Sequence, residues 1–132
     1  MRENMATYTG LKKCGKGWDN LIEETLKKLP DHVIIDNIKE KFGELCIYPR
    51  EYIKDIDEIL FDAQRKSKTI CELCGIQDSS VDKQYYIDGS WLRTLCAKCR
   101  KEENALRIPR QQIDREIINK AKKAARKNIQ KD

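Results

Sequence analysis

Apolar residues recur at helical spacing in two stretches of the chain. From Trp18 to Leu29 they stand three or four residues apart, and Pro30 follows, so this stretch predicts a helix with one buried face. A second stretch runs from about Glu51 to Lys66, and its acidic start and basic end suit the helix dipole. Its apolar stripe consists of Tyr52, Ile56, Ile59, Leu60 and Ala63. We interpret Trp18 as a core anchor and the acidic residues as a solvated face.

Two other stretches have the composition of paired β-strands. The β-branched segment from Val33 to Lys39 and the segment from Glu44 to Tyr48 flank a Lys-Phe-Gly turn, which predicts a hairpin. Residues 84–87 and 90–95 flank an Asp-Gly pair, a strong signal for a second hairpin. Trp91, in this second hairpin, either supports the core of a small module or belongs to a contact surface, and we expect the first.

The two ends of the chain differ from its middle. Residues 1–13 are polar and lack periodicity, which predicts a flexible leader. Residues 97–106 have a helical composition, and Pro109 predicts a break after which a last helix begins.

Four cysteines stand in two Cys-x-x-Cys pairs, Cys71 with Cys74 and Cys96 with Cys99. Two such pairs at this separation supply four thiolates to one tetrahedral ion, so we predict one structural Zn²⁺ as the cofactor. Two disulfides or four unrelated buried thiols are the alternative. The order of first pair, hairpin and a helix carrying the second pair is that of a treble-clef zinc finger. The other two cysteines are interpreted as structural thiols.

The predicted fold class is therefore α+β. A small αββα body covers residues 14–68, and a four-cysteine zinc module of treble-clef or ribbon-like type covers residues 69–106. A basic C-terminal helix covers residues 107–132. With 39% hydrophobic and 37% charged residues among 132, the core is modest, so a structural metal matters for folding. No run approaches the roughly 20 apolar residues of a membrane span, and the start lacks a signal region, so we expect a cytoplasmic protein without membrane contact.

The net charge of +5 is unevenly distributed. Residues 107–132 carry nine Lys or Arg against three acidic residues, whereas residues 1–106 carry eighteen against nineteen. Attraction to nucleic-acid phosphates should therefore come from the C-terminal helix and the adjoining zinc helix. The candidate nucleic-acid-binding residues are Arg93, Lys98, Arg100, Lys101, Arg110, Arg115, Lys120, Lys122, Lys123, Arg126 and Lys127.

The sequence argues against an enzyme. A closed four-cysteine site has no open coordination position and cannot activate water. The layout is similar to that of the HNH-type endonucleases, which need histidines between and after the cysteine pairs. Residues 70–106 contain none, and His32, the one histidine, is expected at the surface. No catalytic residue is predicted.

Three segments together resemble a family of small, largely uncharacterised proteins of bacteriophages and prophage-bearing bacteria. They are Cys14-Gly-Lys-Gly-Trp18, the stretch from Ile38 to Tyr48 (Ile-Lys-Glu-Lys-Phe-Gly-Glu-Leu-Cys-Ile-Tyr), and Ser67 to Cys99 with Cys-Glu-Leu-Cys-Gly and Gly-Ser-Trp-Leu-Arg-Thr-Leu-Cys. The family commonly has Arg where this chain has Cys46, so a role of that Arg does not transfer. The resemblance implies an accessory protein in a bacterial host cell and implies no reaction.

The leading hypothesis is a non-enzymatic phage-type accessory protein that binds a host or phage protein through its zinc module and body. Inhibition of a bacterial defence system is one version of it. The alternative is a regulator that binds DNA or RNA through the basic helix, and a degenerate nuclease is the third hypothesis. The sequence predicts no oligomeric state.

Overall fold

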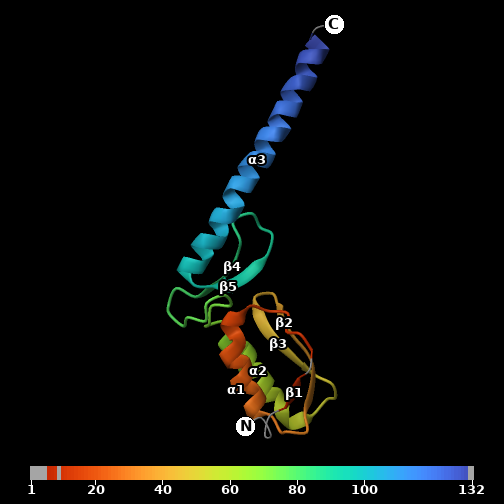
Figure 1. The fold of residues 1–132 in the computed structure, drawn as a ribbon, viewed down its shortest axis with the longest axis vertical. Coiled ribbons are helices and arrows are strands. Elements are labelled where there is room, and N and C mark those ends of the chain that lie inside the picture. The colour runs from red at the N-terminus through yellow and green to blue at the C-terminus, as the bar shows by residue number, and fades with distance from the viewer. Residues whose placement is uncertain (1–5, 9, 131–132) are drawn as a thin grey trace.

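The computed structural model describes residues 6–8 and 10–130, and the side chains of residues 108–116, 118 and 125–130 lie outside the description. Figure 1 shows a body of helices and strands, a smaller module beside it, and one long helix that points away from both. The elements in chain order are β1 (Thr7–Tyr8), η1 (Lys16–Trp18), α1 (Asp19–Lys28), β2 (Ile34–Lys41), β3 (Glu44–Pro49), η2 (Lys54–Ile56), α2 (Asp57–Ser67), β4 (Asp82–Tyr85), β5 (Leu92–Leu95) and α3 (Ala97–Gln130). The predicted α+β class is confirmed.

The body is a three-stranded sheet with two helices packed on it (Figure 1). Strand β2 lies in the middle, parallel to β1 and antiparallel to β3, and Ile38 stands opposite Ile47 in the β2–β3 register. The apolar sides of α1, α2 and the sheet form one core, in which Trp18 and Ile38 are fully buried. The predicted αββα order and the core role of Trp18 are confirmed.

The second module is small and is built around the cysteines. Its core consists of Cys71, Tyr86, Leu95, Cys96 and Cys99, with Leu73 and Val81 packed against it. Strands β4 and β5 form the predicted hairpin, although β4 begins and ends two residues earlier than predicted and β5 begins two residues later. Gly89 in its connection has a φ of +72°, a conformation that glycine adopts without strain. Helix α3 follows directly and carries Cys99 in its first turn.

The prediction of a flexible leader over residues 1–13 is wrong for the residues that the structure describes, which are 6–8 and 10–13. Strand β1 adds to the edge of β2, with Thr7 opposite Ile34, and Ala6 is buried in the core. Lys13 forms a further parallel bridge with Lys39. This polar segment is ordered by backbone pairing with β2. Hydrophobic periodicity therefore did not predict a strand here. Residues 1–5 and 9 lie outside the described part.

The second helix begins later than predicted. Ile53 has extended backbone angles, so the helical region starts at Lys54 instead of Glu51. Tyr52 therefore does not join the apolar stripe, and 78% of its surface is exposed.

The predicted break at Pro109 is also wrong, because α3 runs continuously from Ala97 to Gln130. A proline inside a helix removes one backbone hydrogen bond and costs about 3 kcal/mol, which strong helix formers on both sides can offset. The basic segment is therefore an extension of the module's own helix. No helix in the described residues is long and apolar enough to cross a membrane.

Candidate metal centre

The four predicted cysteines converge on one point. The Sγ atoms of Cys71, Cys74, Cys96 and Cys99 all lie within 4.8 Å of one another, and those of Cys74 and Cys96 are 3.7 Å apart. A tetrahedral ion with metal–sulfur bonds of about 2.3 Å requires sulfur–sulfur separations of about 3.8 Å, so this donor set fits one metal ion. Three of the cysteines are buried, whereas Cys74 is exposed at the rim of the site.

Backbone hydrogen bonds fold the first pair into a tight turn. The Gly75 N–H donates to the Cys71 carbonyl (2.9 Å), and the Cys71 N–H donates to the Ile76 carbonyl (2.9 Å). Gly75 has a φ of +82°, the left-handed conformation that this turn requires. Burial raises the pKa of the Cys71 thiol, but the backbone N–H groups around it more than offset this and lower the pKa to about 7. This favours the thiolate, the form that binds metal.

A site in which four thiolates bind one metal ion is closed. It leaves no coordination position for water or substrate. Within the described residues it is the one group of at least three Cys, His, Asp or Glu side chains placed to hold a metal. Cys14 and Cys46 are half-buried and stand outside it, and burial raises the pKa of Cys14 to about 11, which keeps that thiol protonated.

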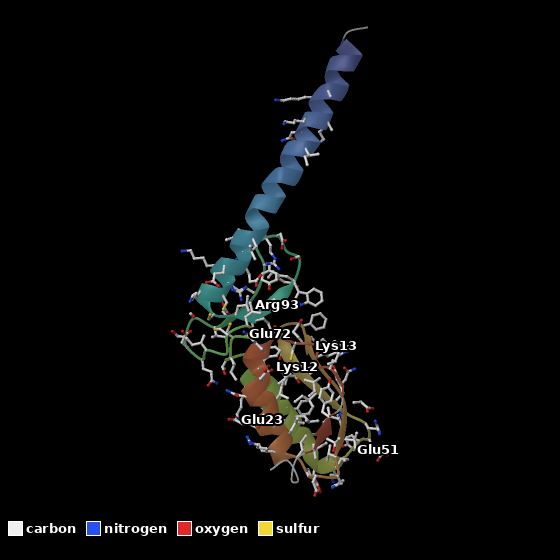
Figure 2. All side chains as sticks on the ribbon, viewed as in Figure 1. Lys12, Lys13, Glu23, Glu51, Glu72 and Arg93 are labelled. Carbon is white, nitrogen blue, oxygen red and sulfur yellow. The ribbon has the colours of Figure 1, made fainter. Side chains whose placement is uncertain are left out.

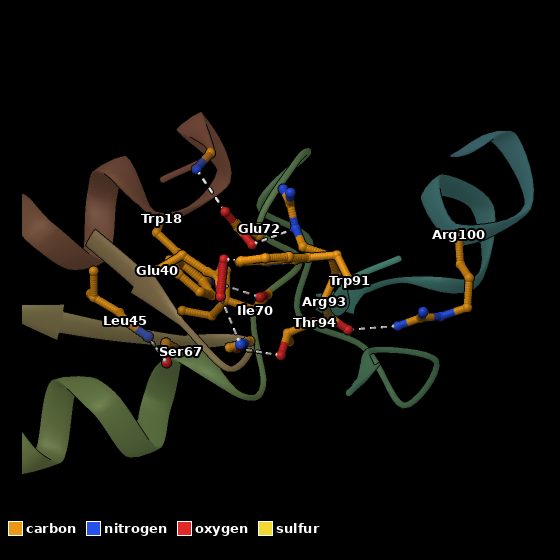
Figure 3. A network of polar contacts seen from close by, with 12 residues as sticks. Trp18, Glu40, Leu45, Ser67, Ile70, Glu72, Trp91, Arg93, Thr94 and Arg100 are labelled. Atoms are coloured by element: carbon orange, nitrogen blue, oxygen red, sulfur yellow. Dashed lines mark hydrogen bonds and ion pairs between the residues drawn. The ribbon is translucent and has the colours of Figure 1, made fainter. Parts of the chain in front are cut away.

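The segment from Cys14 to Trp18 docks the body onto the turn that carries the first cysteine pair. The Gly17 N–H donates to the Glu72 carbonyl (2.7 Å), and the Trp18 indole N–H donates to the Ile70 carbonyl (2.9 Å; Figure 3). A Cβ atom on Gly17 would lie 2.1 Å from the Cys71 carbonyl oxygen, and one on Gly15 would lie 2.4 Å from that of Glu72. The two glycines are thus required by the close approach of two backbones.

A buried carboxylate lies at the centre of this contact. Glu72 is only 2% exposed, and one of its oxygens accepts a hydrogen bond from the Gly15 N–H (2.9 Å). The other lies 2.9 Å from Arg93 Nε in β5 (Figures 2 and 3). Burial raises the pKa of Glu72, while the Gly15 N–H and the Arg93 guanidinium oppose that shift. The Glu72 carboxylate therefore contacts the body through Gly15 and strand β5 of the module through Arg93, and the two atoms of the ion pair are buried.

The turn of the β2–β3 hairpin makes a second contact with the module. The Thr94 hydroxyl donates to the Gly43 carbonyl (2.6 Å), and the Trp91 indole N–H donates to one oxygen of Glu40 (2.7 Å; Figure 3). The other oxygen of Glu40 accepts from the Gly43 N–H (2.9 Å). The Lys83 ammonium lies 2.8 Å from a Glu44 oxygen. The Cys14–Trp18 segment and the β2–β3 turn therefore both contact the module, at one interface.

The expected core role of Trp91 is wrong. Its side chain is 52% exposed, because the module's core is filled by the cysteines, Tyr86 and Leu95, and only the indole N–H is bound, by Glu40. Phe42 and Tyr85 are also exposed, at 66% and 62%. These three aromatic residues, which we call the seam surface, line one groove of about 350 Å³ together with Lys39, Glu40, Lys41, Ser90 and Leu92.

The candidate nucleic-acid-binding residues divide into three groups. Arg93 and Arg100 have structural partners, since Arg100 donates to the carbonyls of Gln84, Asp82 and Arg93. The exposed group on α3 consists of Lys98, Lys101, Lys120, Lys122 and Lys123. The side chains of Arg110, Arg115, Arg126 and Lys127 lie outside the described residues. Sequence reasoning missed Glu40 and Glu72, because no local pattern distinguishes them from surface acids.

No protein-family model, curated protein or solved structure matches this chain.

Proposed function

We propose that this chain is a non-enzymatic binding protein, in which one Zn²⁺ held by Cys71, Cys74, Cys96 and Cys99 stabilises a surface that contacts a partner protein. Zinc is the ion that most often takes four thiolates in a structural site. The observation that carries the proposal is the seam surface. Phe42 comes from the body, whereas Tyr85 and Trp91 come from the module, so the surface is complete only while the two are docked.

The chemistry of the seam surface suits protein recognition. Exposed Trp, Tyr and Phe side chains that cluster are typical of the residues that dominate binding energy at interfaces. The hydrogen bond from Trp91 to Glu40 fixes the indole before a partner arrives, which lowers the entropic cost of binding. The family resemblance suggests a partner of bacterial or phage origin, and inhibition of a host defence system is one version of this function.

Replacing Trp91 with alanine should abolish capture of the partner from a bacterial host lysate while leaving the folded structure intact, because Trp91 is half exposed and contributes little to the core. The measurement is affinity capture at physiological salt with mass spectrometry, beside thermal unfolding of each variant. Tyr52→Ala is the matched control, since Tyr52 is exposed but lies outside the seam surface. Equal capture by W91A and Y52A, or no specific partner for the unaltered chain, would contradict the proposal.

Nucleic-acid binding by α3 is the second candidate function, and the direction of this helix favours it. In Figure 1 α3 extends well beyond the module, and the lysines described along it are exposed. Replacing Lys120, Lys122 and Lys123 with alanine should reduce the salt dependence of binding to a DNA duplex, by about one in the log–log slope for each phosphate that is no longer neutralised. Fluorescence anisotropy over a salt series measures this slope. An unchanged slope, or binding insensitive to salt, would rule this function out.

A further inference from the structure

One edge of the body's sheet is unpaired. Strand β3 has β2 on one side and no strand on the other within the described residues. On β2, the Ile38 carbonyl and the Glu40 N–H both bond to Lys13, on the side away from β3. Directly opposite residues of an antiparallel pair either bond to each other or both point outward. Ile47 and Leu45, which stand opposite Ile38 and Glu40, therefore direct their backbone groups away from β2.

Of these two outward-facing residues, Leu45 has a hydrogen-bond partner in helix α2. The Leu45 N–H donates to the Ser67 hydroxyl (2.9 Å) near the end of α2. No such partner takes the Ile47 N–H in the part of the chain that the structure describes. Beside it lies a groove of about 480 Å³ between β3 and α2, lined on the helix side by Asp57, Leu60, Phe61 and Gln64. Phe61 is 57% exposed there.

We propose that this groove accepts an extended segment of a partner polypeptide, which pairs with Ile47 as an added strand of the sheet. Backbone hydrogen bonds to an unpaired edge provide affinity in this mode, and alternate side chains provide specificity. An unpaired edge strand beside a helix is also the kind of site that invites such pairing. The groove shares Lys41 and Phe42 with the groove of the seam surface, but Ile47, Leu60 and Phe61 lie outside the latter, so the proposal goes beyond the function proposed above.

The surroundings of Ile47 define the chemistry of the segment. A residue directly opposite Ile47 shares its face of the sheet, so it meets Leu60 and Phe61 and should be bulky and apolar. Its two neighbours stand beside Cys46 and Tyr48 on the other face, where the Lys39 ammonium lies 5.2 Å from the centre of the Tyr48 ring and Lys41 stands opposite Glu44. Neither lysine forms an ion pair within the described residues. The expected sequence is therefore an apolar residue between acidic ones, without proline.

The experiment selects 12-residue peptides from a random display library on the full zinc-loaded chain. Peptides of acidic–apolar–acidic pattern should be enriched. Phe61→Ala should weaken the best one about tenfold, as expected when one apolar side chain is removed from an interface. Amide hydrogen exchange at Ile47 should slow by at least about tenfold when this peptide is bound, because its N–H then gains an acceptor. A merely apolar contact with Phe61 would not change that exchange rate.

Controls separate this proposal from the others. Trp91→Ala should leave the peptide affinity unchanged, so failure at the seam surface and failure at the β3 edge are distinguishable. Lys39→Glu with Lys41→Glu should weaken the acidic peptide and spare a neutral one. The proposal is overturned if no peptide is enriched, if the peptides depend on Trp91, or if Ile47 exchange does not change. Two further outcomes would also overturn it. Concentration-dependent dimers that protect the Ile47 N–H without peptide would assign the edge to a second copy of the chain. Preferential binding of single-stranded DNA in this groove would assign it to a nucleic acid.

Discussion

Removal of the metal should unfold the module around the four cysteines and leave much of the body's sheet folded. The module's own core holds five buried residues, too few to be stable without a staple. Binding of structural zinc by small modules contributes about 10–16 kcal/mol, and that contribution is lost with the ion. The body has a separate core around Trp18 and Ile38, so it should keep part of its structure.

The buried indole of Trp18 reports this change directly. Its N–H bonds to Ile70, the residue before Cys71, so unfolding of the module exposes that hydrogen bond to water. In a Trp91→Phe background Trp18 is the remaining tryptophan, and a chelator titration should shift its emission as zinc is released. Limited proteolysis should then cut between residues 72 and 96 in the metal-free protein only.

Serine variants provide the matched comparison for the same result. Cys71→Ser should lower zinc content well below one ion per chain, measured by elemental analysis, and should reproduce the effect of the chelator. Cys46→Ser removes a half-buried thiol outside the cluster and should change neither zinc content nor emission. Equal thermal unfolding of these two variants would contradict a stabilising role of the metal.

The features that sequence predicts well here depend on local signals. The helix from Trp18, the two hairpins and the pairing of cysteines follow from periodicity, turn residues and spacing within a few positions. Pro109 shows the limit of such signals, because helix-forming residues on both sides outweigh the single backbone bond that a proline removes.

The features that sequence does not predict depend on contacts between distant segments. Strand β1 is held by backbone pairing with β2, which any polar sequence can provide. Trp91 faces outward because Glu40, fifty-one positions earlier, accepts its N–H. In the sequence Glu72 looks like a surface acid. It is buried because the turn that contains Gly15 and Gly17 contacts the turn that carries the first cysteine pair. The interface between body and module, and with it the seam surface, becomes visible only in three dimensions.

Replacing Glu72 with glutamine should destabilise the zinc-loaded chain by about 3–5 kcal/mol, the usual cost of breaking a buried ion pair from one side. The amide oxygen can still accept the Gly15 N–H, so the loss isolates the charge that faces Arg93. Arg93→Met should cost a comparable amount, because it leaves the Glu72 carboxylate buried without its cation. Urea denaturation at saturating zinc measures the free energy of unfolding of each variant.

The double variant E72Q/R93M decides whether the charges act as a pair. Because neither charge remains, the double variant should lose less free energy of unfolding than the sum of the two single losses. The difference, which is the coupling energy of the pair, should be about 1–3 kcal/mol. Arg50→Met is the control, because it breaks an ion pair with Asp36 in which both side chains are about half exposed, and such pairs contribute about 0–1 kcal/mol. Strictly additive losses, or an E72Q effect no larger than that of R50M, would show that the ion pair with Arg93 does not stabilise the chain. The expected coupling instead assigns part of the stability of this contact to a charge pair of the module, whose carboxylate the docked body also contacts through Gly15.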